Sequence, residues 1–172
     1  TIPTVSGNLY NVTTSDGQTL NGNTDDLTIT FPSAGTYDVN ISGDFRQIKF
    51  NQGGDKSKLL DVKNWGNIAW TSFDSAFWGC INFSNYSATD APNLSAVSNF
   101  SAVFAQSSFN GNISNWDVSG ATRTWAMFYQ ITSFNQDLSS WDVSNVTDMG
   151  YMFHQTTSFN QSLANWDINQ VT

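Results

Sequence analysis

Three aspartates recur at a spacing of 25 residues and give the clearest pattern of carboxylates in the sequence. Asp117, Asp142 and Asp167 each follow a tryptophan and precede a valine or isoleucine. In stacked strands about 4.8 Å apart they would form an acidic row. Adjacent carboxylates repel unless a cation, a donor or protonation relieves them. The row predicts either a surface for a cation or polar ligand, or turns in which each carboxylate accepts local hydrogen bonds. The turn interpretation is preferred, because repeats preserve residues that make the fold.

One tryptophan departs from this periodicity. Trp125 has Gly150 at the equivalent place in the following repeat, so it is the better candidate for an exposed aromatic contact. Tyr129 and Tyr151 are possible companions. The recurring tryptophans, such as Trp141, could suggest sugar stacking, but their inward strand phase predicts that they pack in the core.

The remaining reactive side chains predict no catalytic centre, metal site or cofactor. Cys80 is the single cysteine and His154 the single histidine, too few ligands for a zinc site. The apolar flanks of Cys80 predict a buried thiol. No nucleophile motif accompanies His154, which is expected to be an ordinary surface or half-buried residue. A glycoside hydrolase needs two carboxylates that converge in a cleft, and a row of aspartates does not supply them. The chain is therefore predicted not to be an enzyme.

Composition narrows the function further. The 172 residues carry a formal charge of −8, and all 14 acidic residues are Asp. Five of the six basic residues lie within residues 46–63, but Asp55 and Asp61 lie among them and Asp44 lies beside them. This mixture indicates a solvated patch rather than the basic surface that nucleic-acid binding needs. No apolar run is long enough to span a membrane.

The elements that position these residues come from an internal repeat. Residues 109–133 and 134–158 are two copies of a 25-residue unit, and residues 159–172 begin a third. Weaker matches extend the pattern toward the N-terminus. We therefore predict a solenoid over residues 51–172, with about four coils, of which the first two are degenerate and the last is truncated.

Each unit is predicted to contain a short parallel strand and a short helix. Leu138, Trp141 and Val143 follow leucine-rich-repeat strand spacing, and Val146–Phe153 carries apolar residues at helical spacing. The expected fold class is α/β, a leucine-rich-repeat-like solenoid. Four large side chains are expected to be nearly fully buried in it: Trp116, Phe128, Trp141 and Phe153.

The first 50 residues lack the repeat and show a different residue pattern. Residues 28–31, 37–41 and 46–50 alternate like strands, and residues 15–17 and 21–23 are turn signals. We predict an antiparallel β unit over residues 1–50 that caps the N-terminal end of the solenoid.

The repeat FNQDLSSWDVSNVTDMGYMF, at residues 134–153, resembles the BspA-like bacterial surface proteins. Residues 53–80 and 88–100 resemble the region that precedes such repeats, and residues 33–45 look like the β segment ahead of it. The resemblance implies secretion or display on a bacterial cell surface, and adhesion to a host, a matrix or a neighbouring cell.

The resulting functional prediction is a non-enzymatic surface protein that binds a protein or glycan ligand. It is expected to use neither nucleic acid nor membrane insertion. The alternatives are a structural spacer within a larger adhesin and a surface that binds ice or mineral. A contiguous aromatic patch would favour ligand binding over the spacer.

Overall fold

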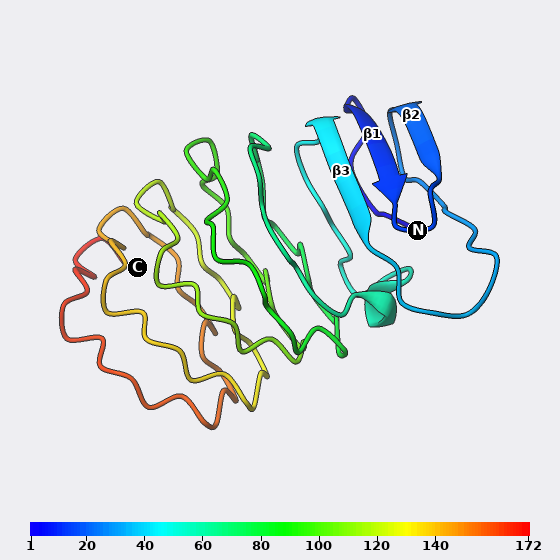
Figure 1. Cartoon of the computed structure of the whole chain (residues 1–172). Helices are drawn as coiled ribbons and strands as arrows, with labels where there is room; N and C mark the ends of the chain where they lie inside the picture. The colour runs from blue at the N-terminus through cyan, green and yellow to red at the C-terminus, as the bar shows by residue number, and fades with distance from the viewer.

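Most of the chain winds into a stack of irregular coils with a small β-sheet at one end (Figure 1). The computed structural model describes all 172 residues. Figure 1 shows the sheet beside the first coil and the C-terminus at the opposite end of the stack. Hydrogen bonds between positions about 25 residues apart connect successive coils. The repeat in the sequence is therefore also the repeat in the structure.

The coils contain no helix, so the prediction of an α/β leucine-rich-repeat solenoid is wrong. The only helical element is a single 3-10 turn, η1 (Lys56–Lys58), which lies before the coils. No strand forms at Leu138–Val143, where the parallel strand was predicted. The isolated parallel bridges of Arg123 with Asn99 and with Asp148 lie instead where the helix was expected. Leucine-rich-repeat architecture is thus not the way in which this repeat folds.

The amides of each coil explain why the helical spacing gives no helix. Ala126, Phe128 and Gln130 donate their amides to carbonyls of the next coil, while the amides of Met127 and Tyr129 close turns by bonding the carbonyl three residues earlier. An α-helix would need each of these amides for its own i→i−4 bond. Ala126 and Gln130 also have φ values of 53° and 58°, in the left-handed region. Apolar spacing typical of a helix is satisfied here by a chain of turns.

The interior of the stack is a column of aromatic rings. Phe77, Phe104, Phe128 and Phe153 stack in that order, with ring-centroid separations of 5.6, 6.0 and 5.6 Å. Phe128 is fully buried and Trp141 is only 4% exposed, as the sequence predicts, and Trp116 is buried too. Phe153 is half-buried, which contradicts the prediction, because no further coil covers it.

The N-terminal sheet is antiparallel, with strand order β2-β1-β3. Its strands are β1 (Leu9–Thr14), β2 (Thr19–Asn23) and β3 (Val39–Asp44). The turn predicted at residues 15–17 lies between β1 and β2, but residues 21–23 belong to β2. Of the three predicted strand segments, only residues 37–41 overlap a strand. Tyr10 of β1 packs edge-on against Phe45, at 4.9 Å, and both belong to the same apolar cluster as the coils. The division of the chain at residue 50 stays a prediction.

A tyrosine joins the irregular first coils to the regular ones. The hydroxyl of Tyr86 accepts hydrogen bonds from the indoles of Trp65, at 2.7 Å, and Trp116, at 3.1 Å. Its ring occupies the space beside Gly111, where an added Cβ would lie 2.5 Å from Tyr86. The glycine in this copy of the repeat, where the next two copies carry glutamine, is thus explained by Tyr86. No helix in the structure has the length and apolar character needed to cross a membrane.

Candidate binding face

The candidate site is an aromatic face on the side of the coils where the inter-coil amide ladder runs. Each coil presents equivalent positions here, and the ladder fixes them in register. One column of equivalent positions holds Trp78, Ala105, Tyr129 and His154, each directly after a stacked core phenylalanine. Three of its four members are therefore aromatic.

Alanines interrupt the aromatic side chains and leave a notch. Ala105 lies in its column between Trp78 and Tyr129, one coil from each. Ala102 and Ala126 hold the positions that Tyr151 occupies in the last coil. The side-chain volume missing at these positions forms a shallow groove whose lining is entirely apolar: Trp78, Ala102, Ala105, Trp125, Ala126, Tyr129 and Tyr151.

The notch has the width of two coil steps. The phenylalanines beneath it are separated by 5.6 Å and 6.0 Å across the same coils. A space of this width admits one flat ring or one extended chain between aromatic walls. Grooves of this kind, apolar with few polar groups, are typical of ligand sites.

Trp125 stands at the rim of the notch and is half-buried. It contacts Tyr151 edge-on, with ring centroids 6.1 Å apart. Its indole nitrogen makes no hydrogen bond within the protein and is not buried, so it is free to donate to a ligand. Gly150 gives the indole room: a Cβ there would lie 3.0 Å from Trp125 Cδ1. The pairing of Trp125 with Gly150 at equivalent places in successive repeats is thus explained by the space that the indole needs.

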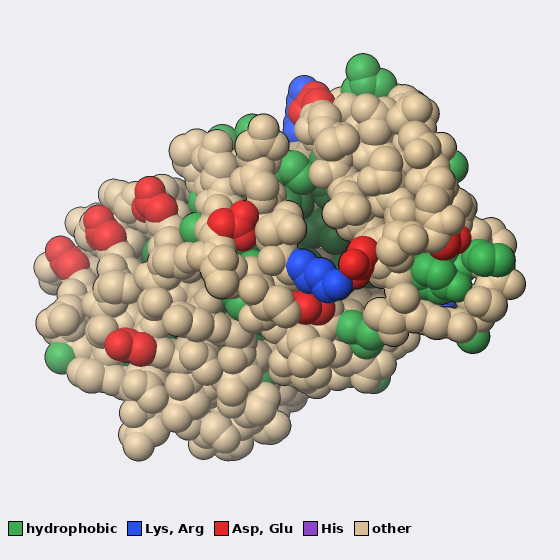
Figure 2. Space-filling model, viewed as in Figure 1, with side chains coloured by type: hydrophobic (Ala, Val, Ile, Leu, Met, Phe, Trp, Pro, Cys, Tyr) green, Lys and Arg blue, Asp and Glu red, His purple; other side chains and the backbone are tan.

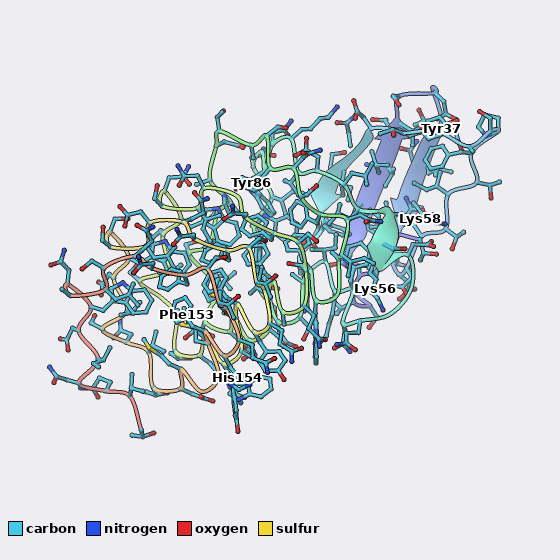
Figure 3. The ribbon with its side chains drawn as sticks, turned by 90° about the horizontal axis from the view of Figure 1, so that it is seen from below. Tyr37, Lys56, Lys58, Tyr86, Phe153 and His154 are labelled. Carbon is cyan, nitrogen blue, oxygen red and sulfur yellow. The ribbon has the colours of Figure 1, made fainter.

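Tyrosine and histidine rings continue the face toward the last coil. His154 stacks on Tyr129, at 5.4 Å, and meets Tyr151 edge-on, at 5.6 Å. His154 is exposed and Tyr151 is 61% exposed. In Figure 3 His154 lies at the edge of the stack, whereas Phe153 lies among the coils. These rings offer their surface to solvent rather than to the core.

A ladder of glutamine amides runs beside the aromatic rings. Gln106 Nε2 donates to Gln130 Oε1, and Gln130 Nε2 donates to Gln155 Oε1, both at 2.6 Å. Gln52 extends the ladder on the other side through Gln106 Oε1, which also accepts from Trp78 Nε1 at 3.1 Å. The ladder fixes Trp78 and places neutral polar groups along one side of the notch.

The electrostatics of the face are close to neutral. Arg123, two residues before Trp125, forms an ion pair with Asp148 of the next coil at 2.9 Å. Asp148 also accepts the amide of Gly150 at 2.9 Å. Because these charges compensate each other, the face selects for neither a strongly anionic nor a strongly cationic ligand.

The acidic row lies in tight turns. Asp117 and Asp142 each accept the amide and the hydroxyl of the serine two residues later, Ser119 and Ser144, at 2.6–3.1 Å. Asp167 accepts the amide of Asn169 at 3.1 Å. The Ser144 hydroxyl and then its amide lower the pKa of Asp142. Ser119 lowers the pKa of Asp117 in the same way, so both pKa values lie below the ordinary value of 3.8. These bonds are the ones that the turn interpretation requires.

The structure brings no metal-binding cluster together: nowhere do three or more His, Cys, Asp or Glu side chains converge. Figure 2 shows acidic side chains as separate groups over the coils, on a surface that is mostly neutral. Cys80 is fully buried, as predicted, and burial raises the pKa of its thiol to about 12. It is therefore held as an unreactive thiol.

Sequence reasoning found Trp125, Tyr129 and Tyr151 but missed the rest of the face. Trp78, the alanines of the notch and the glutamine ladder match no recognisable sequence motif. The signal that could have found them is positional, since each of them follows or precedes the core phenylalanine column at a fixed offset. Finding them required the alignment of the two degenerate coils with the regular ones.

Comparison with known proteins gives one match. No curated protein and no solved structure matches the sequence. A family model described as "Mycoplasma protein of unknown function, DUF285" matches residues 71–172, more than half of the chain. This match, together with coils that lack a helix, corrects the identification as a BspA-like protein, which is not supported. The chain belongs to the DUF285 family of Mycoplasma proteins of unknown function.

Proposed function

We propose that this protein is a non-enzymatic binding protein whose aromatic face takes a neutral glycan. The observation that carries the proposal is the notch between Trp78 and Tyr129, with Trp125 at its rim. Sugar rings present apolar C–H faces, and these pack against the electron-rich faces of aromatic side chains. The free indole N–H of Trp125 and the glutamine ladder supply the hydrogen bonds that sugar hydroxyls need.

A protein ligand is the second candidate, and one observation favours it. The lining of the notch is wholly apolar, and tryptophan and tyrosine are the residues that dominate protein interfaces. The glycan is preferred because the amides beside the notch are neutral and regularly spaced. A pure spacer has no use for a contiguous aromatic patch.

We further propose that binding serves adhesion and that the protein acts in a secreted form or on a bacterial cell surface. An open face along a stack of coils suits an extended ligand. No chemistry at the notch calls for catalysis, because no carboxylate pair or nucleophile lines it. Protease shaving of intact cells followed by detection of released fragments tests the location. Release of the coils supports surface display, and protection until the cells are lysed contradicts it.

The test of binding is an array of neutral glycans and matrix proteins probed with three proteins. These are the wild type, Trp125→Ala, and Asp142→Asn as a matched control on the acidic row. We expect signal on glycans that falls at least tenfold in Trp125→Ala and is unchanged in Asp142→Asn. Signal on proteins alone would select the second candidate. Binding that depends on Asp142 rather than Trp125 would contradict the assignment of the face.

A further inference from the structure

The lining of the notch divides into two aromatic walls and a floor of alanines. Trp78 and Tyr129 form the walls and are half-buried, so part of each ring reaches solvent. Ala102, Ala105 and Ala126 form the floor, and each of them is at most 2% exposed. A sugar ring can therefore pack against the walls, whereas the narrow floor is within reach only of a group about the size of a methyl.

The backbone holds this floor at a fixed depth. Ala102 and Ala126 donate their amides to carbonyls of the next coil, both at 2.8 Å. The carbonyl of Ala105 accepts the amide of Gly79, from the preceding coil, also at 2.8 Å. Because these residues are bonded to the coils on either side, the floor cannot sink to admit a larger group.

The glutamine ladder beside the notch has more open donors than open acceptors. A primary amide carries two N–H donors and one oxygen with two lone pairs. Gln106 Oε1 accepts from Gln52 and from the Trp78 indole, so both of its lone pairs are used. Gln106 Nε2 gives one hydrogen to Gln130 Oε1, and Gln130 Nε2 gives one to the next coil. Each of these two nitrogens keeps a second hydrogen, while of the two oxygens only Gln130 Oε1 keeps a lone pair.

The indole of Trp125 adds a third open donor. Trp125 lines the same notch, and its Nε1–H makes no hydrogen bond within the protein. Three N–H donors are thus available against one amide lone pair. A surplus of donors favours a ligand group that offers a carbonyl oxygen, because such an oxygen accepts hydrogen bonds and donates none.

We propose that the notch recognises the acetamido group of a neutral N-acetylhexosamine. The inference rests on the proposed glycan function and names the class of sugar. The acetyl methyl would lie on the alanine floor, with the sugar ring against Trp78 or Tyr129. The acetyl carbonyl would accept from a ladder amide of Gln106 or Gln130, and the single N–H of the group corresponds to the single open lone pair of the ladder.

Other neutral and acidic sugars fit these features less well. An unsubstituted hexose has neither the methyl nor the carbonyl, and a deoxy sugar with a terminal methyl lacks the carbonyl. An acidic N-acetylated sugar would bring a carboxylate to a notch that no charged side chain lines, so its charge would have no counter-ion there.

Isothermal titration calorimetry of the whole chain with matched sugars tests the inference. The pairs are chitotriose with cellotriose, and the methyl glycoside of N-acetylgalactosamine with that of galactose. We expect the acetylated member of at least one pair to bind about tenfold more tightly, through one buried methyl and one added hydrogen bond. Equal affinity within both pairs would overturn the inference and leave the glycan proposal standing. Absence of binding to every neutral glycan would contradict both.

A change in the floor shows whether the preference arises there. The methyl groups added by Ala105→Val fill the floor, so the preference for the acetylated sugar should disappear while cellotriose affinity is unchanged. Ala121→Val is the matched control, because Ala121 is also buried but does not line the notch. It should keep the preference. A folded Ala105→Val that keeps the preference, or its loss in both variants, would overturn the assignment.

Saturation-transfer NMR on the wild-type protein decides the matter if Ala105→Val does not fold. The acetyl methyl protons of chitotriose should receive more saturation than its ring protons, because they lie deepest in the notch. Saturated ring protons with an unsaturated acetyl methyl would overturn the inference.

Discussion

The aromatic face and the acidic row are both products of the repeat, but they use their side chains in opposite ways. One carboxylate oxygen of Asp117 and of Asp142, Oδ1, accepts the amide and the hydroxyl of the serine two residues later. Trp125 keeps its indole N–H free and exposes part of its ring. The recurring carboxylate is therefore part of the scaffold, while the tryptophan that recurs nowhere in its column is available to a ligand. In this protein a regular column marks structure, and a departure from the repeat is where binding is to be sought.

The largest effect is expected from a change in the core, on which both the aromatic face and the acidic row depend. Trp141 precedes Asp142 and is 4% exposed, with its indole donating to the Ile113 carbonyl at 3.1 Å. Trp141→Ala should lower the free energy of unfolding by about 3–5 kcal/mol, through lost burial and the cavity left behind. Urea denaturation measures it. A loss below about 1 kcal/mol would mean that the recurring tryptophans do not form the core.

A second change asks whether every departure from the repeat marks function. Gly111 departs for a structural reason, since an added Cβ would lie 2.5 Å from the partly buried Tyr86 ring, whose hydroxyl is held by the indoles of Trp65 and Trp116. Gly111→Ala should therefore destabilise the fold by about 1–3 kcal/mol, as overpacking does. Gly150→Ala is the matched control, because its Cβ meets the half-buried Trp125, which can shift. Thermal denaturation should rank Gly111→Ala as the more harmful, and the reverse order would contradict the packing around Tyr86.

The smallest expected effect concerns the acidic row. The pKa of Asp142 is lowered in the folded state, so its stabilising contribution is present above the unfolded value of 3.8 and is lost as pH falls through the folded pKa. Asp142→Asn should lower the melting temperature slightly at neutral pH and flatten its fall below pH 3.8. Melting curves from pH 2 to pH 7 measure both.

The effect of calcium on the melting temperature tests whether the acidic row is a cation site. Calcium prefers six to eight oxygen ligands, more than one aspartate in each coil can offer. We expect millimolar calcium to leave the melting temperature unchanged. A calcium-dependent rise that Asp142→Asn abolishes would make the acidic row a binding site after all.

The sequence predicted which residues of the repeat are buried better than it predicted the conformation of the backbone. The alternation of Trp141, Asp142 and Val143 between buried and exposed was correct, because burial follows from the repeat itself. The helix over residues 146–153 was wrong, since apolar spacing cannot report that alternate amides are used between coils. Left-handed residues such as Tyr151, with φ 58°, leave no trace in the sequence when they are not glycine.

The candidate site was predictable only where it breaks the repeat. Trp125 stood out because Gly150 takes its place one coil later. Trp78 and Ala105 were missed, because the steps of their column, from Trp78 to Ala105 and from Ala105 to Tyr129, depart from the 25-residue spacing of the regular copies. Their contribution appears only when the coils are stacked and the alanine leaves a space between two aromatic walls.

The most direct measurement is an NMR titration of the indole N–H signals with a neutral oligosaccharide. Trp125→Phe assigns the Trp125 signal among the seven tryptophans of the chain. The account predicts that Trp125 Nε1–H shifts on titration together with the ring signals of Tyr129 and Tyr151, while the amides of Ser119 and Ser144 in the acidic turns stay in place. Shifts at Ser119 and Ser144 with an unmoved Trp125 signal would contradict the account and place the binding site on the acidic row.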